Sequence, residues 1–368
     1  MRYVSKKHQG NWQSKEFSES PVSTKLLEFF DEKFPEPVVT IALCKCLATV
    51  SCKLERPRFS MLHVAPPRQG KSLSSNVVMK MFAKDFYIDL GSDFTLNSLQ
   101  RYKQEIKENR CLYENDLTLL FASKIKRGKE RLVGGLSELL ADEVYTYQDF
   151  QSKATLRGWV TIVANMTSEA YNNYKERLFG LTFSERVLTL HHVLAKPEMD
   201  AWVSKEEESK NIHFGDKITV DDIENNVQEI PQKYLDLIQC QAREFSYLSL
   251  RGFIGCQDLI KGIVRAHASL NKRQEVCDDD FKFLSMMKDY LTNPFSPYEG
   301  KIVTYASQGQ SYRSICRSIG KPASYVRQVY AVVQKARIRG ILPPPHVTHL
   351  SSLNEKTLAH PEKCRGGA

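Results

Sequence analysis

The apolar positions of this chain recur in two patterns, which predict strands and helices in alternation. Short apolar runs bounded by turn residues are typical of buried strands, and apolar residues three or four apart are typical of helices. The runs predict strands at 59–64, 86–90, 111–113, 160–164 and 188–193. The wider spacing predicts helices at 71–82, 95–109 and 131–140. Because strands alternate with helices, we expect an α/β fold with a parallel sheet covered by helices on both faces.

The pattern outside this region divides the chain into further parts. Two helices are expected between 21 and 53, interrupted by Pro35 and Pro37, and residues 144–157 alternate as a β-hairpin does. The predicted organisation is a flexible leader (1–20), an α/β domain (21–203), a charged linker (204–230), a helical subdomain (231–292), a small helix-turn-helix unit (298–345) and a flexible tail (346–368). The chain of 368 residues is long enough for several domains.

A candidate phosphate-binding loop joins the first predicted strand to the helix after it. Residues 65–72 read Ala-Pro-Pro-Arg-Gln-Gly-Lys-Ser, which departs from G-x-x-x-x-G-K-[ST] at Ala65. In such a loop, backbone N–H groups face the phosphates, Lys71 neutralises charge and Ser72 reaches Mg²⁺. A basic loop without a ligand is the alternative, and the flanking strand and helix favour phosphate binding. The residues predicted to contact nucleotide are Ala65, Pro66, Pro67, Arg68, Gln69, Gly70, Lys71, Ser72 and Leu73.

Acidic residues follow the third predicted strand. Asp116 is the predicted partner of Ser72 in holding Mg²⁺, and Glu114 is the alternate acid. In many nucleotide hydrolases a Glu directly after the Asp polarises the attacking water, but this chain has Leu117 there. Either Glu114 takes that role or hydrolysis is slow. A solvated acidic turn is the alternative interpretation of both residues.

Two further residues are candidates for catalysis. Asn165 is expected at the carboxyl end of the strand 160–164, where ligands bind in an open α/β sheet, and its amide can orient the attacking water. Arg186 precedes the last strand and is a candidate arginine finger that reaches the γ-phosphate of a neighbouring subunit. The alternatives are a turn residue for Asn165 and a surface ion pair with Glu185 or Glu176 for Arg186.

The order of these elements resembles the AAA+ ATPases, in the branch that holds the minichromosome-maintenance (MCM) helicases of DNA replication and bacterial enhancer-binding activators. In that branch a helix and a β-hairpin lie between the Walker B and sensor 1 strands. Residues 131–140 match the helix, 145–156 the hairpin, 163–167 sensor 1 and 183–186 the arginine-finger segment. The resemblance implies ATP and Mg²⁺ as ligands and self-association into a ring or filament.

The helical subdomain adds to the resemblance. Residues 259–270, with Ala266-His267-Ala268, followed by 276–281 are similar to the MCM lid. The resemblance implies a sensor 2 arginine about three turns before Ala266. Gly255 occupies that position, so the role is assigned to Arg251. The chain has no G-A-F-T-G-A loop, which argues against an enhancer-binding activator.

The C-terminal region is basic and has a helix-turn-helix pattern. A short helix (311–320), a turn (321–324) and a longer helix (325–336) would share an apolar face, and residues 337–342 would begin a wing. No acidic residue occurs from 312 to 339, which favours DNA over the alternative, a helical hairpin packed on the ATPase core. The residues predicted to contact DNA are Arg313, Lys321, Ser324, Tyr325, Arg327, Gln328, Lys335 and Arg337.

Composition limits the compartment and the partners. The net charge of +9 is consistent with a polyanionic partner, here duplex or single-stranded DNA. No apolar run approaches membrane-spanning length and the nine cysteines are scattered, so we expect free buried thiols and a cytoplasmic, non-membrane protein, nucleoid-associated in a prokaryote. Three functions follow: an ATP-driven helicase, translocase or remodeller on DNA, an ATP-switched DNA-binding initiator or regulator, and, less favoured, a protein-remodelling ATPase.

Overall fold

The computed structural model describes two compact units, and each is considered by itself. One comprises residues 1–194 with 198–300, and the other 195–197 with 301–368. The described residues are 22–91, 99–118, 126–148, 153–180, 183–194, 198–199, 202, 217–227, 230–249, 252–291, 302–303, 305–306 and 309–338. The predicted leader (1–20) and tail (346–368) therefore lie outside the described residues.

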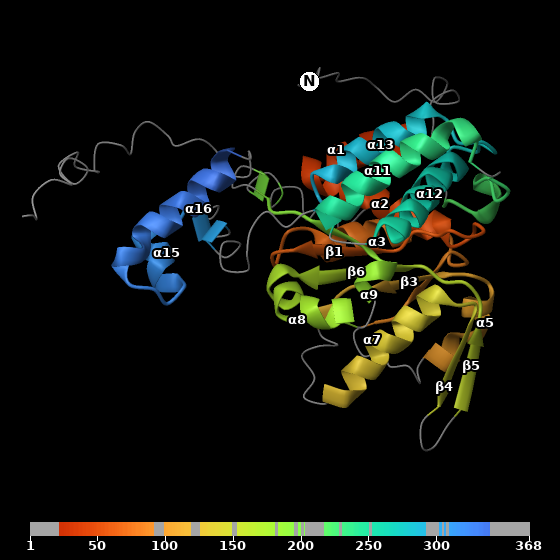
Figure 1. The fold of residues 1–368 in the computed structure, drawn as a ribbon, viewed down its shortest axis with the longest axis horizontal. Coiled ribbons are helices and arrows are strands. Elements are labelled where there is room, and N and C mark those ends of the chain that lie inside the picture. Colours follow the sequence, from red (N-terminus) through yellow and green to blue (C-terminus); the bar gives the residue numbers. More distant parts are fainter. Residues whose placement is uncertain are drawn as a thin grey trace, which may run out of the picture. The chain divides into compact units, whose positions relative to one another are not determined.

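A five-stranded parallel sheet forms the centre of the first unit (Figure 1). The strands are β1 (Met61–Ala65), β2 (Tyr87–Asp89), β3 (Cys111–Glu114), β6 (Ile162–Thr167) and β7 (Leu188–His191), in the order β2-β3-β6-β1-β7. All neighbouring pairs are parallel, so every strand ends at the same edge. This confirms the predicted α/β fold with a parallel sheet flanked by helices.

Helices cover both faces of the sheet (Figure 1). One face carries α1 (Val22–Lys33), α2 (Glu36–Ser51), α3 (Lys71–Met81), α11 (Leu235–Ser249), α12 (Phe253–Leu270) and α13 (Asp278–Lys288). The other face carries α7 (Lys126–Ala141), α8 (Ser168–Gly180) and the short α9 (Phe183–Arg186). Alternate strand residues divide between the two cores, as Tyr113 and Val163 face the first and Leu112 and Ala164 the second.

Helix α2 is the most buried helix segment of the first core. Every side chain from Pro37 to Ser51 is buried, because α2 packs against α1, α3, α12 and the sheet. Its sequence is apolar on all sides, which is typical of a helix surrounded by protein. Lys45 lies in the middle of this helix and is fully buried with it.

Helix α7 and a β-hairpin are inserted between β3 and β6, which are neighbours in the sheet. The hairpin consists of β4 (Val144–Gln148) and β5 (Lys153–Arg157), paired antiparallel from Val144 opposite Arg157. This confirms the predicted helix and hairpin and their place in the chain order. The region expected to be helical at 95–109 is helical from 99 to 107 in its described part, where the 3₁₀ helix η1 (Gln100–Tyr102) leads into the short α5 (Lys103–Lys107).

The helical part shares the first core with the sheet. Of the predicted linker, residues 217–227 pack on this unit: Ile218 pairs with Phe82, and Ile223 and Val227 are buried. Two 3₁₀ turns, η2 (Val220–Asp222) and η3 (Gln232–Tyr234), lead into α11. The predicted lid helices thus form one compact unit with the α/β part.

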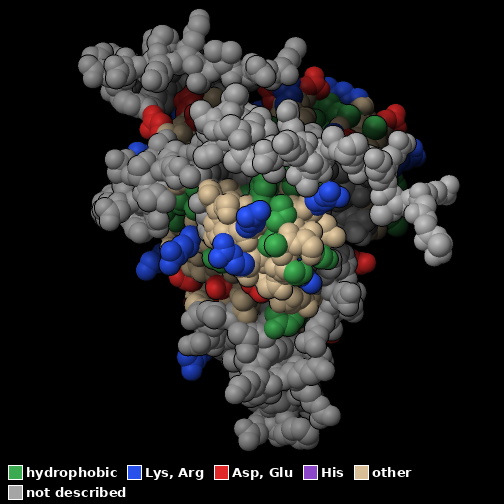
Figure 2. All heavy atoms as spheres, turned by 90° about the vertical axis from the view of Figure 1, so that its left-hand side faces the viewer, with side chains coloured by type: hydrophobic (Ala, Val, Ile, Leu, Met, Phe, Trp, Pro, Cys, Tyr) green, Lys and Arg blue, Asp and Glu red, His purple; other side chains and the backbone are tan. Residues whose placement is uncertain are grey.

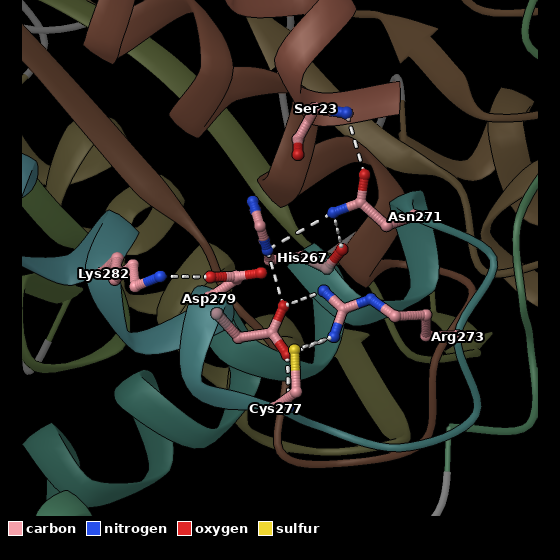
Figure 3. Close-up of polar contacts among 8 residues, drawn as sticks. Ser23, His267, Asn271, Arg273, Cys277, Asp279 and Lys282 are labelled. Carbon is pink, nitrogen blue, oxygen red and sulfur yellow. Dashed lines mark hydrogen bonds and ion pairs between the residues drawn. The ribbon is translucent and has the colours of Figure 1, made fainter. Parts of the chain in front are cut away.

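A buried carboxylate joins α12 to α13 (Figure 3). Asp280 contacts His267 Nδ1 at 2.6 Å, accepts two hydrogen bonds from Arg273 and accepts the backbone N–H of Cys277 at 2.7 Å. Asn271 donates to the His267 carbonyl. We call these five residues the Asp280 cluster. Burial alone would raise the pKa of Asp280, but the bonds from His267 and Arg273 outweigh it and hold the pKa below its ordinary value.

The second unit is a small helical structure. Helix α15 (Tyr312–Ser318) is capped by the Ser311 hydroxyl, which accepts the Ser314 N–H at 3.2 Å. A turn follows, in which Gly320 has φ +67°, then η4 (Ala323–Tyr325) and α16 (Val326–Ile338). The buried side chains are Ile302, Val303, Ile315, Cys316, Val329, Val332 and Val333. Most of the predicted wing (337–342) lies outside the described residues.

Candidate nucleotide-binding site

The loop between β1 and α3 contains two residues in the left-handed conformation. Arg68 and Gly70 both have positive φ, 61° and 78°. The loop begins at the carboxyl end of β1, which lies between β6 and β7 in the sheet. Pro66 and Gln69 are buried, while Pro67 and Arg68 are exposed. At Arg68 the loop adopts the left-handed conformation without a glycine.

Lys71 is the first residue of α3 and lies inside the loop. Its ammonium donates to the carbonyls of Ala65 at 2.9 Å and Pro66 at 2.6 Å, so one of its three N–H groups remains for another acceptor. Burial lowers the pKa of Lys71 to about 8, and the negative charge of Asp116 opposes that shift. Lys71 is therefore largely protonated at neutral pH and available to an anion.

The N-terminus of α3 presents further donors. The first backbone hydrogen bond of the helix runs from the Ser74 N–H to the Gly70 carbonyl, so the N–H groups before Ser74 have no partner within the helix. Ser72 is exposed, and its hydroxyl lies 3.4 Å from the Asn115 carbonyl at the end of β3. Asp116, the residue after Asn115, is half-buried. The structure thus brings together Lys71, Ser72 and Asp116, as predicted.

Glu114 differs from Asp116 in its surroundings. Its side chain is 1% exposed; Oε1 accepts the Asp116 N–H at 2.9 Å, and Oε2 is buried without a hydrogen-bond partner among the described residues. Burial raises the pKa of Glu114 to about 7, and the charges of Asp116 and Asp89 add to the rise. A carboxyl group with this pKa can accept a proton near neutral pH.

Asn165 does not end a strand, and the prediction that it does is wrong. Strand β6 continues to Thr167, and Asn165 pairs in register with His63 in the interior of the sheet. Its side chain is 1% exposed and points toward α2 and α3. The side-chain amide donates to Ser75 Oγ at 3.0 Å and reaches the Asn115 carbonyl at 3.4 Å. Asn165 therefore joins α3 to the end of β3.

The partner that fixes Asn165 is Lys45, which sequence reasoning missed. The Lys45 ammonium lies within hydrogen-bond distance of Asn165 Oδ1 (3.0 Å) and three further acceptors. These are the Lys71 carbonyl, Ser74 Oγ and Ser75 Oγ, each at 2.8 Å. We call Lys45, Ser74, Ser75 and Asn165 the Lys45 network. Burial, with the charge of Lys71, holds the pKa of Lys45 well below its ordinary value. A lysine inside an otherwise apolar helix was the signal in the sequence.

Two buried histidines hold the other side of the loop. His192 Nε2 lies 2.9 Å from the Gln69 carbonyl, and His192 Nδ1 lies 2.8 Å from His63 Nε2. Because a carbonyl only accepts, His192 donates from Nε2 and accepts from His63 at Nδ1. Burial lowers the pKa of His192 to about 3, so both donors belong to neutral rings. The Gln69 side chain accepts the Leu194 N–H at 3.0 Å.

The Trp202 ring packs against the loop at Gly70. A Cβ at Gly70 would lie 3.2 Å from the Trp202 ring, which is buried and also packs against Phe34. The loop thus has an aromatic contact in addition to its hydrogen bonds. Sequence reasoning placed Trp202 at the end of the α/β domain and gave it no role.

Arg186 lies away from the loop. It precedes β7, whose first residue, Leu188, pairs with Met61 at the start of β1. Because the strands are parallel, Arg186 lies at the amino edge of the sheet and the loop at the carboxyl edge. Arg186 is exposed, so it can reach a nucleotide only in another copy of the chain. Arg251, the predicted sensor 2, lies outside the described residues.

The donors at the loop fit a polyphosphate and a divalent cation. An ammonium group and the free N–H groups at the start of α3 match phosphate oxygens. The exposed Ser72 hydroxyl and the Asp116 carboxylate are the oxygen ligands that Mg²⁺ prefers. The residues of this chain therefore fit a polyphosphate that carries Mg²⁺.

Most of the predicted DNA-contacting residues that the structure describes in the second unit are exposed. They are Arg313, Lys321, Ser324, Arg327 and Gln328, and the further basic residue Arg317 is exposed as well. The Lys321 ammonium lies 5.3 Å from the centre of the half-buried Tyr325 ring. Figure 2 shows Lys and Arg side chains spread over this unit, with hydrophobic and other side chains between them. The side chains of Lys335 and Arg337 lie outside the described residues.

Comparisons with known proteins do not assign the chain to a family. No known family matches its sequence, and a search of curated proteins finds no match either. In the part of the chain that the structure describes, no helix has the length and apolar character needed to cross a membrane.

Proposed function

We propose that this protein binds Mg²⁺·ATP at the loop between β1 and α3. The observation that carries the proposal is the position of Lys71. It lies at the N-terminus of α3, inside a loop with two left-handed residues, and close to Asp116. Such a loop supplies a cation, free N–H groups and a carboxylate within one site. In this proposal Lys71 and the loop N–H groups bind the phosphates, and Ser72 and Asp116 hold Mg²⁺.

The same geometry supports hydrolysis with Glu114 as the general base. When bound, Mg²⁺ supplies Lewis-acid stabilisation of charge on the phosphates. Glu114 is buried, adjacent to Asp116, and its raised pKa suits proton transfer near neutral pH. Asn165 is buried rather than exposed to solvent. Its side-chain amide contacts the Asn115 carbonyl and so holds the end of β3 in place.

We further propose that the protein is an AAA+ ATPase of the MCM-like branch. Support comes from the insertion of α7 and the hairpin between β3 and β6, and from the helical part packed on the same core. The position of Arg186 at the amino edge of the sheet favours a finger that acts on the nucleotide of another copy. Activity would then depend on assembly into a ring or filament.

The test of nucleotide binding is calorimetric titration of the wild type and Lys71→Ala with Mg²⁺·ATP. Truncation of a charged phosphate contact is expected to weaken binding by about 100-fold. Lys80→Ala is the matched control, because Lys80 is an exposed lysine of the same helix and should leave the affinity unchanged. Failure of the wild type to bind ATP, or equal affinity in Lys71→Ala, would contradict the proposal.

The second unit favours DNA as the partner. Its four exposed basic residues on α15, the turn and the start of α16 are the specific observation. In the helix-turn-helix arrangement, the start of α16 would enter the major groove, with Arg327 and Gln328 near the bases. The unit would place the ATPase on duplex DNA.

Duplex binding measured by fluorescence anisotropy at several salt concentrations tests this partner. Lys321→Ala should weaken binding and reduce the salt slope by about 1, as expected for one lost phosphate contact, and Arg327→Ala should weaken binding and relax the preference between sequences. Lys282→Ala, an exposed lysine of the first unit, is the control. A strand-displacement assay then separates the two functions: ATP-dependent unwinding indicates a helicase, and ATP-dependent duplex binding without unwinding indicates a switched initiator or regulator.

A further inference from the structure

The Lys45 network contains a buried cation without a buried anion. Lys45 is 0% exposed, and its contacts are a carbonyl, two hydroxyls and an amide oxygen. Burying a charged group without a countercharge is costly, and a methionine or leucine would fill the same space in an apolar helix at lower cost. The hydrogen bonds that Lys45 makes therefore need an explanation beyond filling the core.

The contacts of Lys45 lead to both sides of the nucleotide site. One is the carbonyl of Lys71, the residue whose ammonium lies in the loop. Another is Asn165 Oδ1. Because Lys45 approaches the oxygen of this amide, the Asn165 N–H groups must point the other way, to Ser75 and to the Asn115 carbonyl. Lys45 thus selects one of the two orientations of the Asn165 amide.

The orientation of the Asn165 amide determines how α3 and the end of β3 are connected. The Asn115 carbonyl lies 3.4 Å both from the Asn165 amide and from the Ser72 hydroxyl, and it immediately precedes Asp116. With the amide reversed, Asn165 would present an oxygen to the Asn115 carbonyl, and the contact would become repulsive. The position of Asp116 relative to Lys71 and Ser72 therefore depends on the buried amine beneath them.

We propose that Lys45 is a positioning residue of the nucleotide site, which holds the phosphate loop and the end of β3 in one arrangement through Asn165. This inference rests on the proposed function, because it assigns a purpose to the site that binds Mg²⁺·ATP. Lys45 touches neither nucleotide nor metal in this scheme. It acts by fixing the backbone of Lys71 and the amide of Asn165.

Two substitutions of equal length separate hydrogen bonding from packing. Lys45→Met fills the space but donates no hydrogen bond. Lys45→Gln keeps N–H donors on a side chain as long as that of methionine, which is one atom shorter than that of lysine. We expect the affinity for Mg²⁺·ATP to fall about tenfold in Lys45→Met, because several buried acceptors lose their donor, and to fall less in Lys45→Gln. Thr40→Val is the matched control: it removes a buried hydroxyl of α2 that bonds to Tyr290, away from the loop.

A double-mutant cycle tests the route through Asn165. If Lys45 acts through this amide, the double variant Lys45→Met with Asn165→Ala should bind Mg²⁺·ATP little more weakly than Asn165→Ala alone. Strictly additive losses would overturn the proposal. Equal affinities in the Met and Gln variants, or wild-type affinity in Lys45→Met, would overturn it as well.

Hydrogen exchange without nucleotide distinguishes failure of this inference from failure of the proposed function. Lys45→Met should speed amide exchange at residues 70–75 and 115–118, and Thr40→Val should not. If the wild type binds no ATP, the proposed function fails, and the exchange result still decides whether Lys45 positions these segments. If Lys45→Met does not fold, Asn165→Ala must speed exchange at the same two segments. Unchanged exchange in the folded variants overturns the positioning role.

Discussion

Two buried polar clusters of the first unit solve the problem of burying charge in opposite ways. In the Asp280 cluster, the carboxylate meets Arg273 and His267 and also accepts the N–H of Cys277 (Figure 3). In the Lys45 network, the ammonium meets oxygens of neutral groups only. The first cluster joins two helices away from the sheet edge. The second lies beneath the phosphate loop.

The difference lies in whether the buried group has an oppositely charged partner. We connect the paired Asp280 cluster with a structural role and the unpaired Lys45 network with a functional one. A carboxylate that accepts hydrogen bonds from an arginine and a histidine keeps its charge, and its pKa falls. An amine without a carboxylate is driven toward its neutral form, and its pKa falls because the charged form is disfavoured. A paired cluster stabilises the fold, whereas a buried amine without a carboxylate is tolerated where a site gains from its geometry. Four predictions test this contrast.

The largest effect is expected from Asp280→Ala. It leaves Arg273 without its carboxylate and removes the cap of α13, so the free energy of unfolding should fall by about 3–5 kcal/mol. Urea denaturation monitored by circular dichroism measures the change. Asp279→Ala is the control, because Asp279 is exposed and pairs with Lys282 on the surface. Equal losses in the two variants would show that the Asp280 cluster is not a structural centre.

The two clusters should affect stability at opposite ends of the pH range. The pKa of Asp280 is lowered, so its contribution is present above its unfolded pKa, about 3.9, and is lost as the pH falls through the lower folded value. The pKa of Lys45 is also lowered, so the unfolded chain binds the extra proton and stability rises with pH toward about 10.4.

Denaturation of the wild type and Lys45→Met across this alkaline range checks the second statement. As the pH rises from the folded pKa of Lys45 toward about 10.4, the stability of the wild type relative to the variant should increase by up to about 1.4 kcal/mol for each pH unit. A constant difference across the range would mean that Lys45 titrates as an exposed lysine does, and the contrast with Asp280 would be lost.

Glu114 is a second buried charge without an opposite partner, and it should limit hydrolysis below neutral pH. Its pKa of about 7 means that kcat/KM should fall about tenfold for each pH unit below that value. Loss of the Lys71 proton should lower kcat/KM above about pH 8. Glu114→Gln should be slow and should lack the acidic limb. Asp89→Asn on the neighbouring strand should keep the acidic limb but move it to lower pH, because the charge of Asp89 adds to the rise in the pKa of Glu114; loss of the limb in that variant instead would assign the base to Asp89.

The smallest effect is expected at the loop itself. Gly70→Ala should cost about 1–2 kcal/mol, because it forces a left-handed alanine and brings its Cβ to 3.2 Å from the Trp202 ring. Gly91→Ala is the control, since Gly91 also has positive φ but no atom lies within 4 Å of a Cβ there. Thermal unfolding with and without Mg²⁺·ATP measures both. Equal shifts in the two variants would show that Trp202 does not constrain the loop.

Much of the fold follows from local patterns in the sequence. Apolar runs and turn residues predict the five sheet strands, and alternation predicts the hairpin at 144–157. The loop between β1 and α3 is also local, because one strand, one turn and the start of one helix form it. The region predicted as helical at 95–109 is helical in its described part, and only the change from the 3₁₀ helix η1 to the short α5 was not predicted. Periodicity alone does not distinguish these two kinds of helix.

The position of Asn165 shows where local reasoning fails. An Asn after an apolar run is typical of a strand end, but here β6 continues because Lys45 and Ser75 satisfy the buried amide. The donor comes from α2, far away in the sequence. Arg186 is a different case, because a residue just before a parallel strand must lie at the amino edge of the sheet, and the sequence already indicated this.

By itself, the sequence determined the alternation of strands and helices, the parallel sheet and the loop that places Lys71 at the start of α3. Hydrophobic periodicity and turn chemistry act over a few residues, so they can be read along the chain. Only the tertiary structure decided that Lys45, Ser75 and Asn165 meet beneath that loop, and that His63 and His192 hold its other side. These groups come from separate elements, and a buried polar group finds its partner only when the sheet and α2 have packed.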